Sequence, residues 1–180
     1  MAGGGGIGER VKSLYLSSMK SLAVTFLVFL TSCSSSNIYI MRHAERANES
    51  DTTSLSVAGL TRVRMLSDRL DNAGIDSIFV TPYRRTEQTA TPLASRLGLP
   101  LTKYPAAPVT VITNRLRTFR GKNVLVVGHS NTILEIVKGL GVLPSMQKIE
   151  HSEYQNFLLV RVRHTPFSRR VYLEEQKLNP

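Results

Sequence analysis

The cationic side chains best suited to chemistry stand where short apolar runs of this sequence end. Three runs are followed by such residues: Arg42 with His43, Arg84 with Arg85, and His129. Runs of four or five β-forming residues predict buried strands, and ligands of open α/β sheets bind at the carboxyl ends of the strands. An imidazole nucleophile surrounded by guanidinium groups, which bind oxygens in pairs, is suited to phosphoryl transfer. The sequence therefore predicts a phosphate-handling site at one edge of a sheet.

Three stretches resemble those of a known family and occur in the same order. They are NIYIMRHAER (37–46), TPYRRTEQTA (81–90) and VLVVGHSNT (124–132), and Leu55-Ser56 and Gly59 between the first two also match. From about Asn37 to Val162 the chain resembles the histidine phosphatase superfamily, also called phosphoglycerate mutase-like. The resemblance implies an α/β fold, a three-layer sandwich with a mostly parallel central sheet. One departure is Ala44, where the family usually has Gly.

The same resemblance implies roles for five residues. His43 matches the family's nucleophile, which attacks phosphorus and carries the phosphoryl group until water removes it. Arg42 and Arg85 match its phosphate-binding arginines, with Arg84 as the rival of Arg85. His129 matches its second histidine, which binds the equatorial oxygens of the transferred group. No metal and no cofactor is implied.

Further residues are expected around this centre. Arg46 is expected to add positive charge at the rim, or to be an ordinary surface arginine. Ser130 and Asn131, at the start of a helix, are expected to offer neutral donors to the substrate, because helix N-termini favour anions. His151 and His164 stand in polar surroundings and are interpreted as surface residues.

A proton donor for the leaving group is hard to identify. No Asp or Glu occurs between Gln88 and Leu134, where family members that handle poor leaving groups often have one. Glu45 and Glu153 are the remaining candidates. The chain thus resembles the family's small, minimal phosphatases.

The order of the expected elements supports this fold class. Strands are expected at 37–41, 76–81, 101–104, 123–127, 157–162 and 170–173, and helices at 57–73, 84–97, 109–120 and 130–140. Apolar residues recur at three- and four-residue spacing in the helices, and Ser56 is placed to cap the first of them. Alternation of strands and helices predicts a mostly parallel sheet, with the last two strands antiparallel at or near its edge.

The first 36 residues do not resemble part of a domain. The apolar run Leu22–Leu30 is too short to span a bilayer but suits a signal peptide. It ends in LTSC, similar to a bacterial lipoprotein signal in which Cys33 is lipidated. The alternative is an ordinary secretory signal. We expect residues 1–36 to be an extension with signal peptide and a short tether, Ser34–Ser36, and residues 37–180 to be the phosphatase domain.

The net charge of +10 raises the question of nucleic-acid binding. The basic residues of the chain are scattered and lack interleaved aromatic residues, so a solvated basic surface is expected, with no nucleic acid as partner.

The predicted protein is a membrane-anchored extracytoplasmic lipoprotein that hydrolyses a small phosphorylated substrate through a phosphohistidine on His43. The alternatives are a protein phosphohistidine phosphatase and a non-catalytic binder of phosphorylated envelope molecules.

Overall fold

Six strands form one sheet in the order β3-β2-β4-β1-β5-β6. The computed structural model describes residue 12 and residues 33–179 apart from residue 51. The strands are β1 (Ser34–Arg42), β2 (Ser77–Val80), β3 (Leu101–Lys103), β4 (Asn123–Gly128), β5 (Asn156–His164) and β6 (Arg169–Lys177). The four strands β3, β2, β4 and β1 run parallel, and β5 and β6 are antiparallel. The predicted sheet, mostly parallel with an antiparallel hairpin at one edge, is confirmed.

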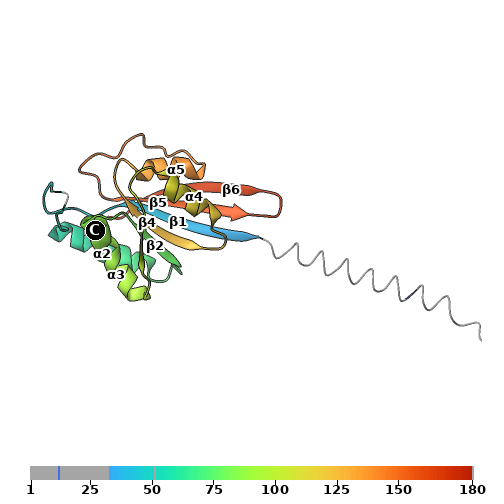
Figure 1. Cartoon of the computed structure of the whole chain (residues 1–180), viewed down its shortest axis with the longest axis horizontal. Coiled ribbons are helices and arrows are strands. Elements are labelled where there is room, and N and C mark those ends of the chain that lie inside the picture. The colour runs from blue at the N-terminus through green and yellow to red at the C-terminus, as the bar shows by residue number, and fades with distance from the viewer. Residues whose placement is uncertain (1–11, 13–32, 51, 180) are drawn as a thin grey trace, which may run out of the picture.

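Helices cover both faces of this sheet (Figure 1). The helices are α2 (Val57–Leu70), α3 (Arg84–Leu97), α4 (Thr110–Thr118) and α5 (Ile133–Leu140). One core packs α4 and α5 against alternate residues of the central strands, among them Ile38, Ile40 and Val126. The other packs α2 and α3 against the opposite side chains, such as Met41 and Val127. Period-two alternation along strands buried on both faces thus produces the three layers.

The signals that bound the helices are mostly local. The Ser56 hydroxyl accepts a hydrogen bond from Gly59 N at 3.1 Å and caps α2, as its position predicts. Gly98 and Gly141 end α3 and α5 with positive φ, a conformation that costs glycine little. The helix expected from residue 130 begins only at Ile133, after a turn in which Thr132 N and Ile133 N donate to His129 O.

The expected tether at Ser34–Ser36 is wrong for the described chain. These residues are the first of β1 and pair with His164, Arg163 and Val162 of β5. The seryl side chains form no apolar pattern that would predict a strand, but backbone pairing with the long β5 extends β1 to Ser34. Cys33 therefore directly precedes the first residue of β1, which is one of the central strands in Figure 1.

Candidate active site

The parallel pairing of β1 and β4 brings His43 and His129 together. Arg42 is the register partner of Gly128, and His43 N donates to Gly128 O at 2.9 Å. Each histidine immediately follows one of these partners. Their imidazole rings lie 5.5 Å apart between centroids at an interplanar angle of 64°. Two residues 86 positions apart in the sequence thus share the carboxyl edge of the sheet, as the strand-end pattern predicts.

The protonation state of His43 is set by one hydrogen bond and by burial. Its Nδ1 lies 2.8 Å from Ala44 O. A carbonyl oxygen only accepts, so Nδ1 carries the proton of the neutral ring and Nε2 keeps its lone pair. Burial, followed by the charges of Arg42, His129 and Arg85, lowers the pKa of His43 to about 3. The ring is consequently unprotonated at neutral pH, with its Nε2 lone pair in the state that a nucleophile requires.

This low pKa predicts an acid-dependent loss of stability. The unfolded chain binds a proton at His43 near the ordinary pKa of 6.5, whereas the folded chain does so only near 3, so stability is lost as the pH falls through that interval. Between pH 7 and pH 5 wild-type protein should lose roughly 1 to 2 kcal/mol more unfolding free energy than His43→Asn, from at most about 1.4 kcal/mol per pH unit. Denaturant unfolding at both pH values measures this. Parallel pH curves for the two proteins would contradict the assigned state of His43.

Arg42 is buried and joins the sheet edge to a distant loop. It is 2% exposed, and its Nη1 lies 3.1, 2.9 and 3.2 Å from the carbonyl oxygens of Glu150, His151 and Glu153. Its guanidinium carbon stands 4.1 Å from the centroid of the Tyr154 ring. These three hydrogen bonds all involve Nη1, and Arg42 also lines the pocket that contains His43. Arg42 thereby both fixes the 150–154 loop and supplies a directed positive charge.

Arg85 and Arg84 differ in orientation, and only Arg85 lines the pocket. Arg85 is 7% exposed and lines the same pocket as His43, with its guanidinium carbon 4.5 Å from the Tyr83 ring centroid. Arg84 is exposed on α3 and does not line that pocket. Adjacent helix positions point about 100° apart, so only one of the two can face the sheet edge.

Two threonines hold the second histidine. His129 Nε2 lies 2.9 Å from the Thr81 hydroxyl, which in turn lies 3.0 Å from the Thr86 hydroxyl. The edge of the His129 ring meets the Tyr83 ring at a centroid distance of 5.0 Å and an angle of 84°. His129 is 9% exposed, so its ring is confined on several sides. It is therefore placed rigidly beside His43.

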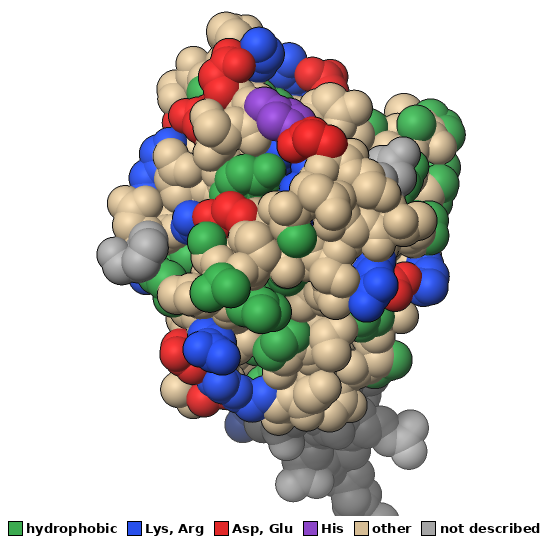
Figure 2. All heavy atoms as spheres, turned by 90° about the vertical axis from the view of Figure 1, so that its left-hand side faces the viewer, with side chains coloured by type: hydrophobic (Ala, Val, Ile, Leu, Met, Phe, Trp, Pro, Cys, Tyr) green, Lys and Arg blue, Asp and Glu red, His purple; other side chains and the backbone are tan. Residues whose placement is uncertain are grey.

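These side chains line a pocket of about 290 Å³. Its lining comprises Arg42, His43, Arg46, Tyr83, Arg85, Ala106, Ala107, His129, Ser130, Asn131, Thr132 and His151. Arg46 belongs to the rim, where it contacts Glu49 and its Nη2 donates to His151 Nε2 at 2.8 Å. On this side of the molecule acidic, basic and histidine side chains stand close together (Figure 2). His151 is a surface residue, as expected, with a side chain that is 66% exposed, and it also lines the rim of this pocket.

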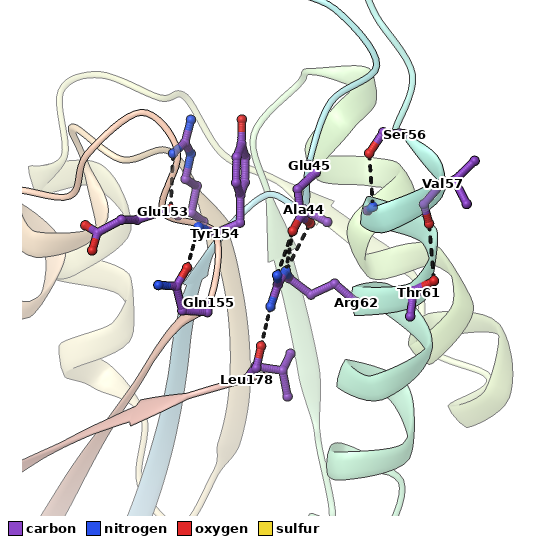
Figure 3. A network of polar contacts seen from close by, with 12 residues as sticks. Ala44, Glu45, Ser56, Val57, Thr61, Arg62, Glu153, Tyr154, Gln155 and Leu178 are labelled. Atoms are coloured by element: carbon purple, nitrogen blue, oxygen red, sulfur yellow. Dashed lines mark hydrogen bonds and ion pairs between the residues drawn. The ribbon is translucent and has the colours of Figure 1, made fainter. Parts of the chain in front are cut away.

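The two carboxylates considered as proton donors do not line the pocket. Glu45 accepts from Arg62 Nε at 3.0 Å and from Arg62 Nη2 at 2.6 Å, and the Arg62 guanidinium continues to Leu178 O (Figure 3). Burial acts most strongly on the pKa of Glu45 and raises it, but the hydrogen bonds with Arg62, a backbone hydrogen bond and the charges of Arg62 and Arg42 together lower the pKa. The Glu153 carboxylate accepts from Glu150 N within its own loop. Both groups are therefore occupied in structural roles, and no described residue that lines the pocket is a carboxylate.

The backbone after His43 is positioned by neighbouring elements. Ala44 N donates to the Thr89 hydroxyl at 3.0 Å, and Leu55 N donates to Gln88 Oε1 at 3.0 Å, so α3 holds both sides of the 44–55 loop. A Cβ on Gly59 would lie 2.2 Å from Glu45 O, which means that α2 approaches this loop only because residue 59 is glycine. The departure at Ala44 is accommodated because its methyl group is fully buried in a small cluster with Leu55 and Val63.

Sequence reasoning missed the aromatic residues of the site. Tyr83 contacts both Arg85 and His129, and Tyr154 lies 5.9 Å from His43 between ring centroids. Tyr83 precedes the paired arginines, which offered a signal for it. Tyr154 belongs to a loop without periodic pattern, and nothing in its sequence neighbourhood indicates that it stacks on Arg42.

Two further expectations concern metals and membranes. Among the described residues there is no group of three or more His, Cys, Asp or Glu side chains placed to hold a metal ion. In the same part of the chain no helix is long and apolar enough to cross a bilayer. The apolar run at 22–30 and the rest of the expected signal peptide lie outside the described residues.

Comparisons with known proteins agree with the resemblance. Residues 38–106 match the family model described as histidine phosphatase superfamily (branch 1). No curated protein matches the sequence closely enough to count as a relative. The match covers less than half of the chain but contains the segments bearing His43 and Arg85, and it confirms the predicted resemblance to this family.

Solved structures share the fold at low sequence identity. The protein histidine phosphatase SixA complexed with tungstate has a TM-score of 0.62 at 20% identity, covering 79% of this chain and 97% of that one. A mycobacterial glucosyl-3-phosphoglycerate phosphatase has a TM-score of 0.63 at 14% identity, covering 79% and 99%. The alpha-ribazole phosphatase from Shigella flexneri has a TM-score of 0.59 at 14% identity, covering 78% and 96%. The phosphoglycerate mutase-like fold is therefore confirmed over most of the chain.

Proposed function

We propose that this chain, a member of the histidine phosphatase superfamily and a histidine-type phosphatase, hydrolyses a small phosphorylated substrate through a phosphohistidine on His43. The observation that carries the proposal is the Nδ1 contact of His43 with Ala44 O, which leaves Nε2 free in a pocket lined by Arg42, Arg85 and His129. A neutral, oriented imidazole among cationic groups matches the requirement of covalent phosphoryl transfer.

The reaction proceeds in two displacements. His43 Nε2 forms a bond to phosphorus while the bond from phosphorus to the leaving oxygen breaks. Water then attacks the phosphohistidine, the bond between phosphorus and nitrogen breaks, and inorganic phosphate leaves with His43 restored. Arg42, Arg85 and His129 bind the oxygens of the phosphoryl group throughout, because fixed donors in a partly buried site stabilise developing charge without reorganising.

Other residues that line the pocket are proposed to bind the substrate around this centre. Ser130 and Asn131 line the pocket beside His129 and offer neutral donors. Arg46 lies at the rim, where its charge is shared with Glu49, its ion-pair partner. A phosphatase assay distinguishes an enzyme from a non-catalytic binder of phosphorylated molecules. A purified chain that hydrolyses an aryl phosphate is an enzyme, whereas one that binds inorganic phosphate without hydrolysing any phosphoryl compound is the non-catalytic binder.

A steep dependence on the leaving group is expected. Because Glu45 and Glu153 do not line the pocket, charge on the departing oxygen goes unneutralised by a carboxylate. Aryl phosphates, acyl phosphates and phosphoramidates should be cleaved much faster than alkyl monoesters. The rate of the first step across phenyl phosphates of graded leaving-group pKa measures this. A nearly flat series that becomes steep in His151→Gln or Tyr83→Phe would identify a donor in the pocket and refute this account.

A phosphohistidine substrate is the second candidate. Its leaving group is an imidazole, which departs well without help from a carboxylate, and SixA is among the structures that share the fold. Comparing a phosphorylated histidine peptide with small phosphoramidates separates the two candidates. Much higher kcat/KM for the peptide would make it the substrate class.

The proposal includes a lipid anchor outside the cytoplasm. It is supported by the LTSC sequence and by the place of Cys33 next to β1, at the end of the strand opposite the one that carries Arg42 and His43. An anchor at Cys33 would leave the pocket facing away from the membrane. Stable attachment needs more than one acyl chain, which lipoprotein processing supplies.

Cys33→Ser should abolish the anchor. We expect wild-type protein in the membrane fraction with lipid on Cys33, and the variant as soluble protein or as unprocessed precursor. Fractionation with mass spectrometry of the N-terminal peptide measures both. Wild-type protein that is cleaved elsewhere and remains wholly soluble would refute the anchor without bearing on the phosphatase activity.

A further inference from the structure

A second cationic pocket lies at the end of β1 remote from the catalytic centre. It has a volume of about 620 Å³ and is lined by Cys33, Ser34, Arg120, His164, Arg169 and the turn between the last two. The sheet register builds it, because His164 pairs with Ser34 of β1 on one side and with Arg169 of β6 on the other. Arg120 comes from the segment that follows α4.

His164 is buried there without a hydrogen-bond partner. It is 9% exposed, and within the described chain neither Nδ1 nor Nε2 has a partner. The interpretation of His164 as a surface residue is therefore wrong, because β6 and the start of β1 cover it. Buried polar atoms without hydrogen bonds lower the stability of the fold. Such atoms therefore need an explanation, and a bound ligand would provide one.

The groups around His164 are cationic. Burial, followed by the charges of Arg120 and Arg169, lowers the pKa of His164. Burial and the charges of Arg117 and Arg120 lower the pKa of Arg169 in the same way. Among the described residues, Arg120 donates to the carbonyl oxygens of Arg117 and Phe119, and Arg169 to that of Leu140. In the described part of the chain neither guanidinium pairs with a carboxylate.

We propose that this pocket is a binding site for a phosphate group, held by Arg120 and Arg169 with His164 beneath them. An anion between the guanidinium groups offsets their mutual repulsion and uses their remaining donors, which suit phosphate oxygens. The site is independent of hydrolysis at His43, which occurs at the other end of β1.

Two sources of phosphate fit this chemistry, a lipid headgroup and a free phosphate or phosphate ester. The neighbouring surface favours the headgroup. Phe167, at the tip of the turn, is 91% exposed, and Arg169 and Arg170 follow it at the start of β6. Side chains alternate along the strands, so Arg169 shares the face of His164, whereas the exposed register partners Arg163 and Arg170 lie on the other face of the hairpin. An exposed aromatic side chain among arginines is suited to an anionic membrane surface. Exposed Cys33 lines the same pocket, so the headgroup source also agrees with the proposed anchor.

Histidine NMR of the full chain in uncharged detergent micelles tests the site. The chain has four histidines, so the His164 ring signal is identified by its loss in His164→Gln. We expect the signal to shift, and its pKa to rise, on adding inorganic phosphate in one arm or phosphatidylglycerol in the other, with phosphatidylcholine as the zwitterionic control. A response to phosphate identifies a site for free phosphate compounds, and a response to phosphatidylglycerol alone identifies a headgroup site.

Two substituted proteins, one altered in the pocket and one altered elsewhere on the surface, serve as test and control. Arg120→Ser combined with Arg169→Ser should abolish the response of His164 while retaining hydrolysis of an aryl phosphate. Arg64→Ser removes a charge from an exposed position on α2 and should change neither. Absence of a His164 response in both arms, or a response that survives the double substitution, would overturn the proposal. Because the signal belongs to His164, phosphate bound at His43 does not mimic it.

Discussion

His43→Asn is expected to abolish phosphatase activity, with a fall in kcat of at least about 10⁴-fold, as is typical when a covalent nucleophile is removed. The physical reason is specific to one atom. The asparagine amide can still donate to Ala44 O, as His43 Nδ1 does, but it offers no lone pair in place of Nε2. Steady-state hydrolysis of an aryl phosphate measures the change.

Phosphate binding by the variant serves as the control for this substitution. Arg42, Arg85 and His129 are unchanged in His43→Asn, so inorganic phosphate should still bind, as ligand protection against unfolding would show. A variant that retains substantial kcat would mean that another group attacks phosphorus. A variant that unfolds is recognised by its unfolding curve and is then replaced by His43→Gln.

Arg42→Ala should have the second-largest effect, a decrease in kcat of about 10² to 10³-fold, by analogy with removal of one preorganised donor. Arg42→Lys should recover only part of it, because an ammonium group lacks the planar fork that binds two phosphate oxygens. The three carbonyl contacts of Arg42 with the 150–154 loop would also be weakened in both variants. Some increase in KM is therefore expected as well.

Arg84→Ala is the matched control for Arg42→Ala. Arg84 is exposed on α3 and does not line the pocket, so kcat/KM should stay near the wild-type value. A loss in Arg84→Ala comparable to that in Arg42→Ala would show that general positive charge, not a directed guanidinium, supports the reaction.

The centre of the site could be predicted from the sequence because its signals are local. A strand that ends in a polar pair places that pair at the sheet edge, which correctly brought His43 and His129 together. The spacing of Arg85 from Gln88 and Thr89, which favoured Arg85 over Arg84, is explained by the contacts of α3. Gln88 and Thr89, one turn further along α3, accept from Leu55 N and Ala44 N and so fix the face of the helix that meets the site.

What could not be predicted depends on contacts between distant segments. Glu45 is a plausible donor in sequence, but Arg62 and the C-terminal carbonyl of Leu178 hold it away from the chemistry. His164 is surrounded by polar residues in sequence and is buried by strands from both ends of the chain. Tyr154 stacks on Arg42, which is 112 positions earlier. Periodicity and motifs carry no information on such pairings.

The most direct measurement of the central claim is detection of the covalent intermediate. Wild-type protein mixed with labelled substrate and quenched rapidly without acid should carry one phosphoryl group that is acid-labile, base-stable and located on His43 by peptide mapping. The neutral Nε2 of His43 predicts this label, and His43→Asn should carry none. A label on another residue, or full turnover in which no phosphoenzyme forms at any time, would contradict the account.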